Sequence, residues 1–148
     1  MVFFRKSQNT KCKLSKLYYE ARLYLLCRKY GIEVKTHTQI GKGFVMINPY
    51  NITISPGAKI GKYVNIMKGA TIGISPSGSH KGAPTIGDCV YIGLNSTVVG
   101  GITVGEDVLI APNTLVNRDV PDHSIVIGSP CKNIPRDNAT KGYVFYKV

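Results

Sequence analysis

The chain has 148 residues, a length that predicts one domain with a hydrophobic core of its own. It carries 19 Lys and Arg residues against 8 Asp and Glu residues, which gives a formal net charge of +11 at pH 7. Such a field favours anionic partners, which include a phosphorylated cofactor, an anionic membrane and nucleic acid. The sequence has no nucleic-acid-binding motif and little aromatic interleaving among its bases outside residues 11–30, so we expect no nucleic-acid partner.

Cysteine usage and the N-terminus favour a cytoplasmic protein. The four cysteines lie far apart and match no metal-ligand spacing, which indicates ordinary thiols in a reducing compartment and no metal site. The opening MVFFRKSQNTK lacks the apolar core of a signal peptide. Residues 89–105 are uncharged, but their four glycines fit the corners of a repeat better than a membrane span.

Residues 11–30 predict an α-helix. The segment contains neither Gly nor Pro, and Gly31 is a plausible stop. An apolar stripe at helical spacing consists of Leu14, Leu17, Tyr18, Ala21 and Leu25. Residues 1–35 hold nine bases and two acids, a local charge of +7. Two interpretations stay open: a helix that packs on the end or side of the following domain, or a basic amphipathic helix that makes peripheral contact with an anionic membrane.

From residue 34 onward an aliphatic side chain returns every six positions. The thirteen positions are Val34, Ile40, Met46, Ile54, Ile60, Ile66, Ile72, Ile86, Ile92, Val98, Val104, Ile110 and Val116. An α-helix cannot produce this period, because its apolar face returns after three and four residues. A period of six is a signature of the parallel β-helix. Three hexads form one triangular coil, so we expect three columns of stacked aliphatic side chains, with coils about 4.8 Å apart.

Two interruptions of the period divide the chain. A two-residue slip follows Met46, and eight extra residues lie between Ile72 and Ile86, in a Gly-, Ser- and Pro-rich stretch that marks a projecting loop. The sequence thus predicts a basic helical segment (1–31), a β-helix of about four to five coils (32–127) with a projecting loop (74–84), and a C-terminal tail (128–148). End coils expose unpaired strand edges, so we expect the helix to cap one end and the tail the other.

Residues 30–136 resemble the left-handed parallel β-helix acyltransferases, in particular the serine acetyltransferases and the short O-acetyltransferases of capsule and exopolysaccharide clusters. The segments that carry the resemblance are NPYNITISPGAKIG (48–61), NIMKGATIG (65–73), KGAPTIGDCVYIG (81–93), GGITVGEDVLIAPNTLV (100–116) and DVPDHSIVIGSPCKNI (119–134). The resemblance implies an all-β fold, a left-handed parallel β-helix with a short N-terminal α-helix and a C-terminal tail. It also implies a homotrimer, or a dimer of trimers.

The resemblance further implies that acetyl-CoA, as acyl donor, lies in a groove between two subunits. Carried over position by position, the groove is expected to be lined by Gly93, Leu94, Ala111 and Pro112, with Lys132 near the phosphates or adenine. Small residues let a pantetheine arm pass close to the backbone, and a lysine supplies a point charge for phosphate. The alternative is that these residues are small only because the tight corners of the coils require small side chains.

The catalytic positions depart from the pattern of the relatives. The resemblance places a general-base histidine at Asn48, oriented by an acid at Glu33, and further histidines at Met67 and Ala83. All three histidines are absent, and an asparagine amide cannot act as a base near neutral pH. His80, in the projecting loop, is the candidate substitute base, with a solvated loop residue as the alternative.

The two other histidines have simpler interpretations. We expect His123 to be structural, near the final turn, and His37 to be exposed to solvent.

Two functions follow as hypotheses. The first is an acetyl-CoA-dependent acetyltransferase that acts on a hydroxyl or amino group of a small acceptor, with a sugar or polysaccharide precursor favoured over serine. The second is a catalytically degenerate repeat protein that binds CoA or a partner enzyme without turnover, because all three family histidines are missing.

Overall fold

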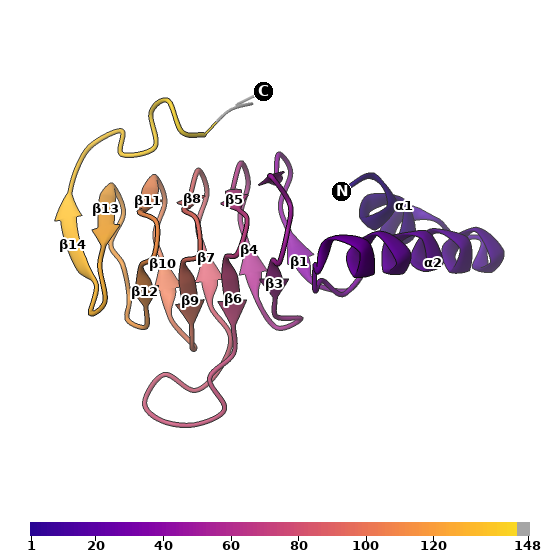
Figure 1. Cartoon of the computed structure of the whole chain (residues 1–148), viewed down its shortest axis with the longest axis horizontal. Helices are drawn as coiled ribbons and strands as arrows, with labels where there is room; N and C mark the ends of the chain where they lie inside the picture. Colours follow the sequence, from indigo (N-terminus) through magenta and orange to yellow (C-terminus); the bar gives the residue numbers. More distant parts are fainter. Residues whose placement is uncertain (145–148) are drawn as a thin grey trace.

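The computed structural model describes residues 1–144, which form an elongated prism of stacked coils with two helices at one end (Figure 1). In chain order the elements are α1 (Val2–Asn9), α2 (Lys13–Tyr30), β1 (Gln39–Ile40), β2 (Val45–Ile47), β3 (Thr53–Ile54), β4 (Lys59–Ile60), β5 (Asn65–Met67), β6 (Thr71–Gly73), β7 (Thr85–Ile86), β8 (Tyr91–Ile92), β9 (Thr97–Val99), β10 (Thr103–Val104), β11 (Val108–Ile110), β12 (Leu115–Val116), β13 (Ser124–Ile127) and β14 (Lys132–Pro135). The short strands follow the hexad period, and each coil turns a corner after every strand.

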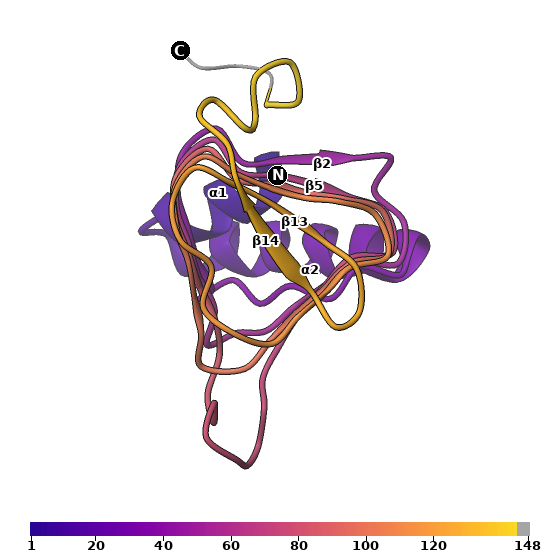
Figure 2. The same ribbon diagram turned by 90° about the vertical axis from the view of Figure 1, so that its left-hand side faces the viewer.

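The strands form the three faces of the prism. The first face contains β1, β4, β7 and β10, the second contains β2, β5, β8, β11, β13 and β14, and the third contains β3, β6, β9 and β12. All pairs are parallel except β13 with β14. Figure 2, a view along the prism, shows that the coils superimpose on one triangular outline.

The three expected columns of aliphatic side chains are confirmed by the strand register. They are Ile40, Ile60, Ile86 and Val104 on the first face, Met46, Ile66, Ile92 and Ile110 on the second, and Ile54, Ile72, Val98 and Val116 on the third. Of these, all but the half-buried Met46 are buried. Burial of branched side chains on every strand is the main term that stabilises the coils.

The corner between the second and third faces is turned by residues in the left-handed conformation. Asn51, Gly69, Asn95 and Asn113 occupy the same place in four successive coils, with φ angles of 52°, 73°, 53° and 57°. Glycine and asparagine adopt this conformation more easily than other residues, which explains their recurrence here. The two-residue slip lies at this corner in the first coil and includes Asn48, whose φ angle is 49°.

Helix α1, which the sequence analysis did not predict, closes the N-terminal end of the prism. The Phe4 side chain is fully buried in the core. The Arg5 guanidinium donates hydrogen bonds to the carbonyl oxygens of Ile40, at 2.6 Å, and Gly41. The Gln8 amide donates to the carbonyl oxygen of Thr36 at 2.8 Å. These carbonyl groups belong to the first coil and have no preceding coil to bond, so α1 satisfies them instead.

Helix α2 begins at Lys13 and ends at Tyr30. Gly31 follows as the C-cap, with a φ angle of 62°, and donates its N–H to the carbonyl oxygen of Cys27. The helix lies at the N-terminal end of the prism (Figure 1), but the stripe at residues 14, 17, 18, 21 and 25 does not pack on the coils. Leu14, Leu17 and Leu25 are 80%, 65% and 60% exposed, and Leu23 on the opposite side contacts the core. Apolar residues therefore lie on two opposite faces of α2. Within the described residues, neither helix is long and apolar enough to cross a membrane.

The C-terminal tail closes the other end of the prism. Its strand β14, also not predicted, pairs antiparallel with β13. The tail then runs back along the outer side of the second face (Figure 1), where the Tyr143 ring packs against Tyr91 with 5.1 Å between centroids. Its last four residues, 145–148, lie outside the described residues.

Asp107 anchors this tail. Its carboxylate accepts hydrogen bonds from the backbone N–H groups of Ala139 and Thr140, from the Thr140 hydroxyl and from His123. Burial acts to raise the pKa of Asp107, but the hydrogen bonds from Thr140, His123 and Ala139 outweigh it and lower the pKa to about 2. His123 thus has the structural position expected from the sequence, and His37 is exposed as expected.

Candidate functional site

The predicted groove residues lie together at the corner that follows the second face. Gly93 donates its N–H to the carbonyl oxygen of Ile110 at 2.9 Å, so Gly93 and Ala111 occupy the same place in adjacent coils. A Cβ atom at Gly93 would lie 2.7 Å from that carbonyl oxygen, and only glycine fits. Leu94 is half-buried and Pro112 is exposed beside them. The coil geometry alone therefore requires glycine at this position, which is buried.

Lys132 continues this corner row. The register places Ala111 beside Ile127, and Ile127 pairs with Lys132 across β13 and β14. In the other direction the row runs from Gly93 through Met67 to Ile47. Four strand residues thus join Gly93 and Ala111, which directly follow β8 and β11, in a row about 24 Å long, given the ordinary strand spacing. We call these six residues the corner row.

Asn48 lies at the opposite end of the corner row from Lys132. It follows Ile47 directly, at the slip in the first coil, and its side chain is exposed. The row therefore has a cation at one end and the predicted reaction position at the other. This arrangement fits a long ligand with phosphate groups at one end.

Glu33 lies near this end of the prism but does not contact Asn48. Its backbone bridges to Thr53, with the Ile54 N–H donating to the Glu33 carbonyl oxygen at 2.8 Å. The Glu33 carboxylate is exposed and has no hydrogen-bond partner in residues 1–144. The predicted pairing of Glu33 with the residue at position 48 is therefore not made within one chain.

His80 lies at a different corner of the prism. The loop of residues 74–84 joins β6 of the third face to β7 of the first, and it projects away from the corner row (Figure 2). The His80 carbonyl oxygen accepts a hydrogen bond from the Gly101 N–H at 2.8 Å, and the imidazole is exposed. Within one chain the structure thus does not bring His80 to Asn48 or to the groove residues.

The sequence analysis missed an aromatic cluster beside the corner row. The Tyr91 hydroxyl donates a hydrogen bond to the sulfur of Met67 at 2.6 Å, and the Tyr143 ring packs on Tyr91. Burial and the neighbouring Tyr143 raise the pKa of Tyr91, so its hydroxyl stays protonated at neutral pH. No sequence pattern identified Tyr143, because it lies in the tail and outside the repeat.

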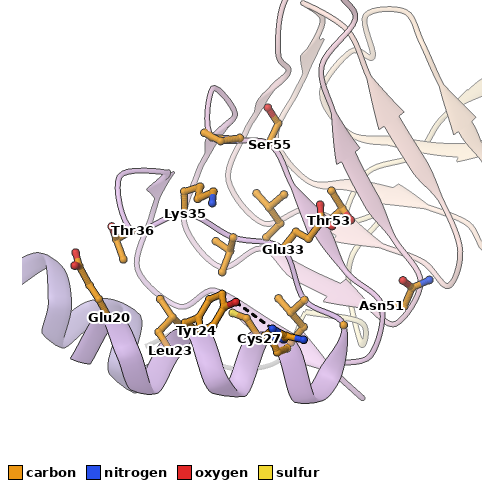
Figure 3. Close-up of a pocket in the computed structure, with 16 residues that line it drawn as sticks. Glu20, Leu23, Tyr24, Cys27, Glu33, Lys35, Thr36, Asn51, Thr53 and Ser55 are labelled. Atoms are coloured by element: carbon orange, nitrogen blue, oxygen red, sulfur yellow. Dashed lines mark hydrogen bonds between the residues drawn. The ribbon is translucent and has the colours of Figure 1, made fainter. Parts of the chain in front are cut away.

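A pocket of about 790 Å³ lies between α2 and the first two coils (Figure 3). Residues from α2 line one side, and residues 31–36 and 51–56 line the other. Glu33 is the predicted site residue that lines it. The remaining lining residues, which include Glu20 and Tyr24, were not predicted.

No protein-family model matches the chain, but individual relatives do. The serine acetyltransferase of Helicobacter pylori strain 26695 is 36% identical over 107 residues, which is 72% of this chain and 63% of that protein. The crystal structure of serine acetyltransferase from Neisseria gonorrhoeae covers 86% of this chain and 53% of its own, at 26% identity and a TM-score of 0.70.

A third match establishes the fold. The serine acetyltransferase of Brucella abortus strain S19 covers 94% of this chain and 57% of its own, at 22% identity and a TM-score of 0.78, and it has also been solved in complex with coenzyme A. The chain thus spans less than two thirds of the length of these relatives. These matches and the three faces of stacked strands identify the chain as a left-handed parallel β-helix protein that is similar to the serine acetyltransferases.

Proposed function

We propose that the protein is an acetyl-CoA-dependent acyltransferase that acts on a hydroxyl or amino group of a small acceptor, serine or a sugar precursor. The observation that carries the proposal is the corner row, with Lys132 at one end and Asn48 at the other. Acetyl-CoA would lie along the row with its phosphates toward Lys132. The similarity to serine acetyltransferases, one of them solved with coenzyme A, supports this donor.

The proposed reaction is a direct transfer without a covalent enzyme intermediate. The acceptor oxygen or nitrogen forms a bond to the thioester carbonyl carbon, the carbon–sulfur bond breaks, and the sulfur of coenzyme A takes up the proton removed from the acceptor and leaves as the thiol. Backbone N–H groups at the corner stabilise the oxyanion. The acceptor proton passes to His80 or to a water molecule held by Asn48, because the Asn48 amide itself is not a base near neutral pH.

We also propose a homotrimer. In one chain the loop that carries His80 and the corner row occupy different corners of the prism. Threefold assembly of the prisms would bring the loop of one subunit toward the corner row of the next. The groove would then be complete only between subunits.

Residues 11–30 add a proposed contact with a membrane surface. The outward face of α2 exposes Leu14, Leu17, Tyr18 and Leu25, in a segment with a local charge of +7 over residues 1–35. Apolar side chains flanked by Lys and Arg are typical of helices that lie on anionic membranes.

A second candidate function is a repeat protein that binds CoA without turnover. The presence of Asn48, Met67 and Ala83 where the resemblance expects histidine supports it.

Thiol release from acetyl-CoA tests the proposal. Wild type and His80→Ala are assayed against serine and a panel of monosaccharides, and calorimetry measures CoA binding separately. We expect acceptor-dependent thiol release from wild type, lowered about 100-fold in His80→Ala. CoA binding without any turnover would favour the degenerate protein. Turnover that His80→Ala leaves unchanged would exclude His80 as the base.

A further inference from the structure

The proposed reaction does not yet use the pocket that lies beside α2. Its volume of about 790 Å³ lies in the range of small-molecule sites. Figure 3 shows side chains from α2 and from the coils facing the hollow from its two sides. We call it the α2–coil pocket; its lining residues used below are Glu20, Tyr24, Arg28, Glu33, Lys35, Asn51, Thr53 and Ser55.

The charges of the α2–coil pocket are balanced, although the chain as a whole carries +11. Glu20 and Glu33 contribute two negative charges, and Arg28 and Lys35 contribute two positive charges. A pocket built for the phosphates of a nucleotide would be positively charged. The balanced charge therefore favours a ligand without net charge. In this respect the pocket differs from the proposed donor site, where Lys132 supplies a positive charge for phosphate.

Most of the polar groups in the pocket lack a protein partner. In residues 1–144, the carboxylates of Glu20 and Glu33 and the ammonium group of Lys35 make no hydrogen bond or ion pair. The hydroxyls of Thr53 and Ser55 also make no hydrogen bond within these residues. Acceptors and donors thus line one hollow together, which suits a ligand that has many hydroxyl groups.

An aromatic ring completes the lining. Tyr24 is 59% exposed, and its hydroxyl accepts a hydrogen bond from Arg28 at 3.2 Å, which holds the ring at the pocket. An exposed ring with a fixed orientation offers an apolar surface at low entropic cost. A sugar ring has apolar C–H faces and polar edges, so it matches this combination of ring and hydrogen-bonding groups.

One lining residue of the pocket belongs to the corner that carries the proposed reaction position. Asn51 lines the pocket and lies at the same corner as Asn48, three residues along the chain. The proposed acyl donor ends at Asn48, so a ligand in the pocket would have one end near the thioester.

We propose that the α2–coil pocket is the acceptor site and that it takes a neutral saccharide. The inference rests on the proposed function, because it names the acceptor of the same reaction. Glu20 and Glu33 accept hydrogen bonds from sugar hydroxyls, Lys35 and Arg28 donate to sugar oxygens, and Tyr24 packs on the ring. A free amino acid such as serine would fill a small part of this volume and leave most of these groups without a partner.

Binding measurements test the pocket without requiring turnover. Titration calorimetry in the presence of CoA measures the affinity for N-acetylglucosamine, galactose, glucose and serine. The variants are Glu20→Gln and Tyr24→Ala. Matched controls are Glu106→Gln, an exposed corner carboxylate, and Tyr18→Ala, which lies on the outward face of α2 and is 56% exposed. Thermal unfolding confirms that each variant is folded.

We expect at least one saccharide to bind, and each pocket variant to weaken it about tenfold, as loss of a hydrogen bond to a charged group or of an aromatic contact predicts. The controls and the affinity for CoA are expected to stay within about twofold of wild type. Binding of serine alone, of no acceptor at all, or of a saccharide with unchanged affinity in both pocket variants would overturn the inference. Loss of acetyl transfer with intact saccharide binding would overturn the proposed function and leave the acceptor site standing.

Discussion

The Arg5 side chain takes the place of a missing coil, because its guanidinium donates to the carbonyl oxygen of Ile40 at 2.6 Å. In the interior of the prism the equivalent carbonyl groups accept from the N–H groups of the preceding coil, as Ile60 does from Gly41. The first coil has no predecessor. One side chain of α1 therefore supplies hydrogen bonds that the repeat itself cannot supply.

Replacement of Arg5 should destabilise the prism from this end. We expect Arg5→Ala to lower the free energy of unfolding by about 1–3 kcal/mol, because it leaves acceptors of the first coil unsatisfied. Urea denaturation followed by circular dichroism measures the change. Arg118→Ala, at an exposed corner, is the matched control and should cost less than about 0.5 kcal/mol. Equal losses for the two variants would show that Arg5 does not cap the coil.

The tail should detach when Asp107 loses its charge. The pKa of Asp107 is lowered to about 2 in the folded protein, so its stabilising effect is present above the ordinary carboxyl pKa and is lost as the pH falls through about 2. We expect the amide resonances of Ala139 and Thr140 to shift over that acid range. Asp107→Asn should release the same two amides at neutral pH. Asp119→Asn is the control, since Asp119 bonds the Thr103 N–H and not the tail.

The contribution of His123 to stability should be lost when the pH rises, whereas that of Asp107 is lost when the pH falls. Its hydrogen bond to Asp107 raises the pKa of His123, so the contribution of this pair is present below the ordinary histidine pKa, as long as Asp107 is ionised, and is lost as the pH rises through the raised pKa. Titration of the imidazole by NMR measures the pKa in wild type and in Asp107→Asn. An unchanged His123 pKa in the variant would contradict the pairing.

Restoring histidine at the end of the corner row should accelerate acyl transfer. We expect Asn48→His to raise kcat by about 100-fold, because a positioned general base contributes at least that much. Initial rates of thiol release measure it. Asn113→His is the control, because Asn113 has the same left-handed backbone conformation but lies three coils away from Asn48. If both variants behave like wild type, Asn48 does not mark the reaction position.

Removal of the Lys132 charge should weaken the binding of acetyl-CoA and leave the binding of the acceptor unaffected. Lys132→Ala is expected to raise the KM for acetyl-CoA about tenfold, with kcat preserved, because one charge-assisted contact to phosphate is lost. Lys59→Ala, exposed on the first face, is the control. A rise in the acceptor KM alone would place the phosphates elsewhere.

The outward face of α2 should mediate binding to anionic vesicles. Wild type is expected to float with phosphatidylglycerol vesicles at low salt and to be released at high salt, since both apolar insertion and charge contribute. Leu14→Ser combined with Leu17→Ser should abolish flotation. Ile74→Ser removes an apolar side chain of similar exposure, 59%, from the loop and should have no effect. No flotation of wild type at low salt would refute the membrane contact.

The period of six predicted the coils and their columns because each inward position repeats the same burial. Val98 stacks between Ile72 and Val116 as the spacing required. The helices could not be predicted as well. A stripe of apolar residues indicates a helix but not which face is buried, and in α2 Leu23 and Leu25 point to opposite environments. Helix α1 is short and contacts the first coil through a few individual side chains, so its sequence has no periodic pattern that would predict it.

The candidate site was predicted in part for the same reason. Gly93 and Ala111 repeat with the coils, and the register brings them into one row with Lys132. Tyr143 and Tyr24 lie outside the repeat, and only the folded chain shows what they contact. His80 belongs to the loop of residues 74–84, which interrupts the repeat. The six-residue period therefore does not predict where this loop projects.

Closure of both ends limits how copies of this chain can associate. A parallel β-helix with open end coils is a template on which another copy can stack and extend into a filament. Here the first coil bonds Arg5 and Gln8 of α1, and the last coil bonds an antiparallel strand that ends at Pro135. These contacts occupy strand edges at both ends, oppose growth along the axis and so favour association through the lateral faces.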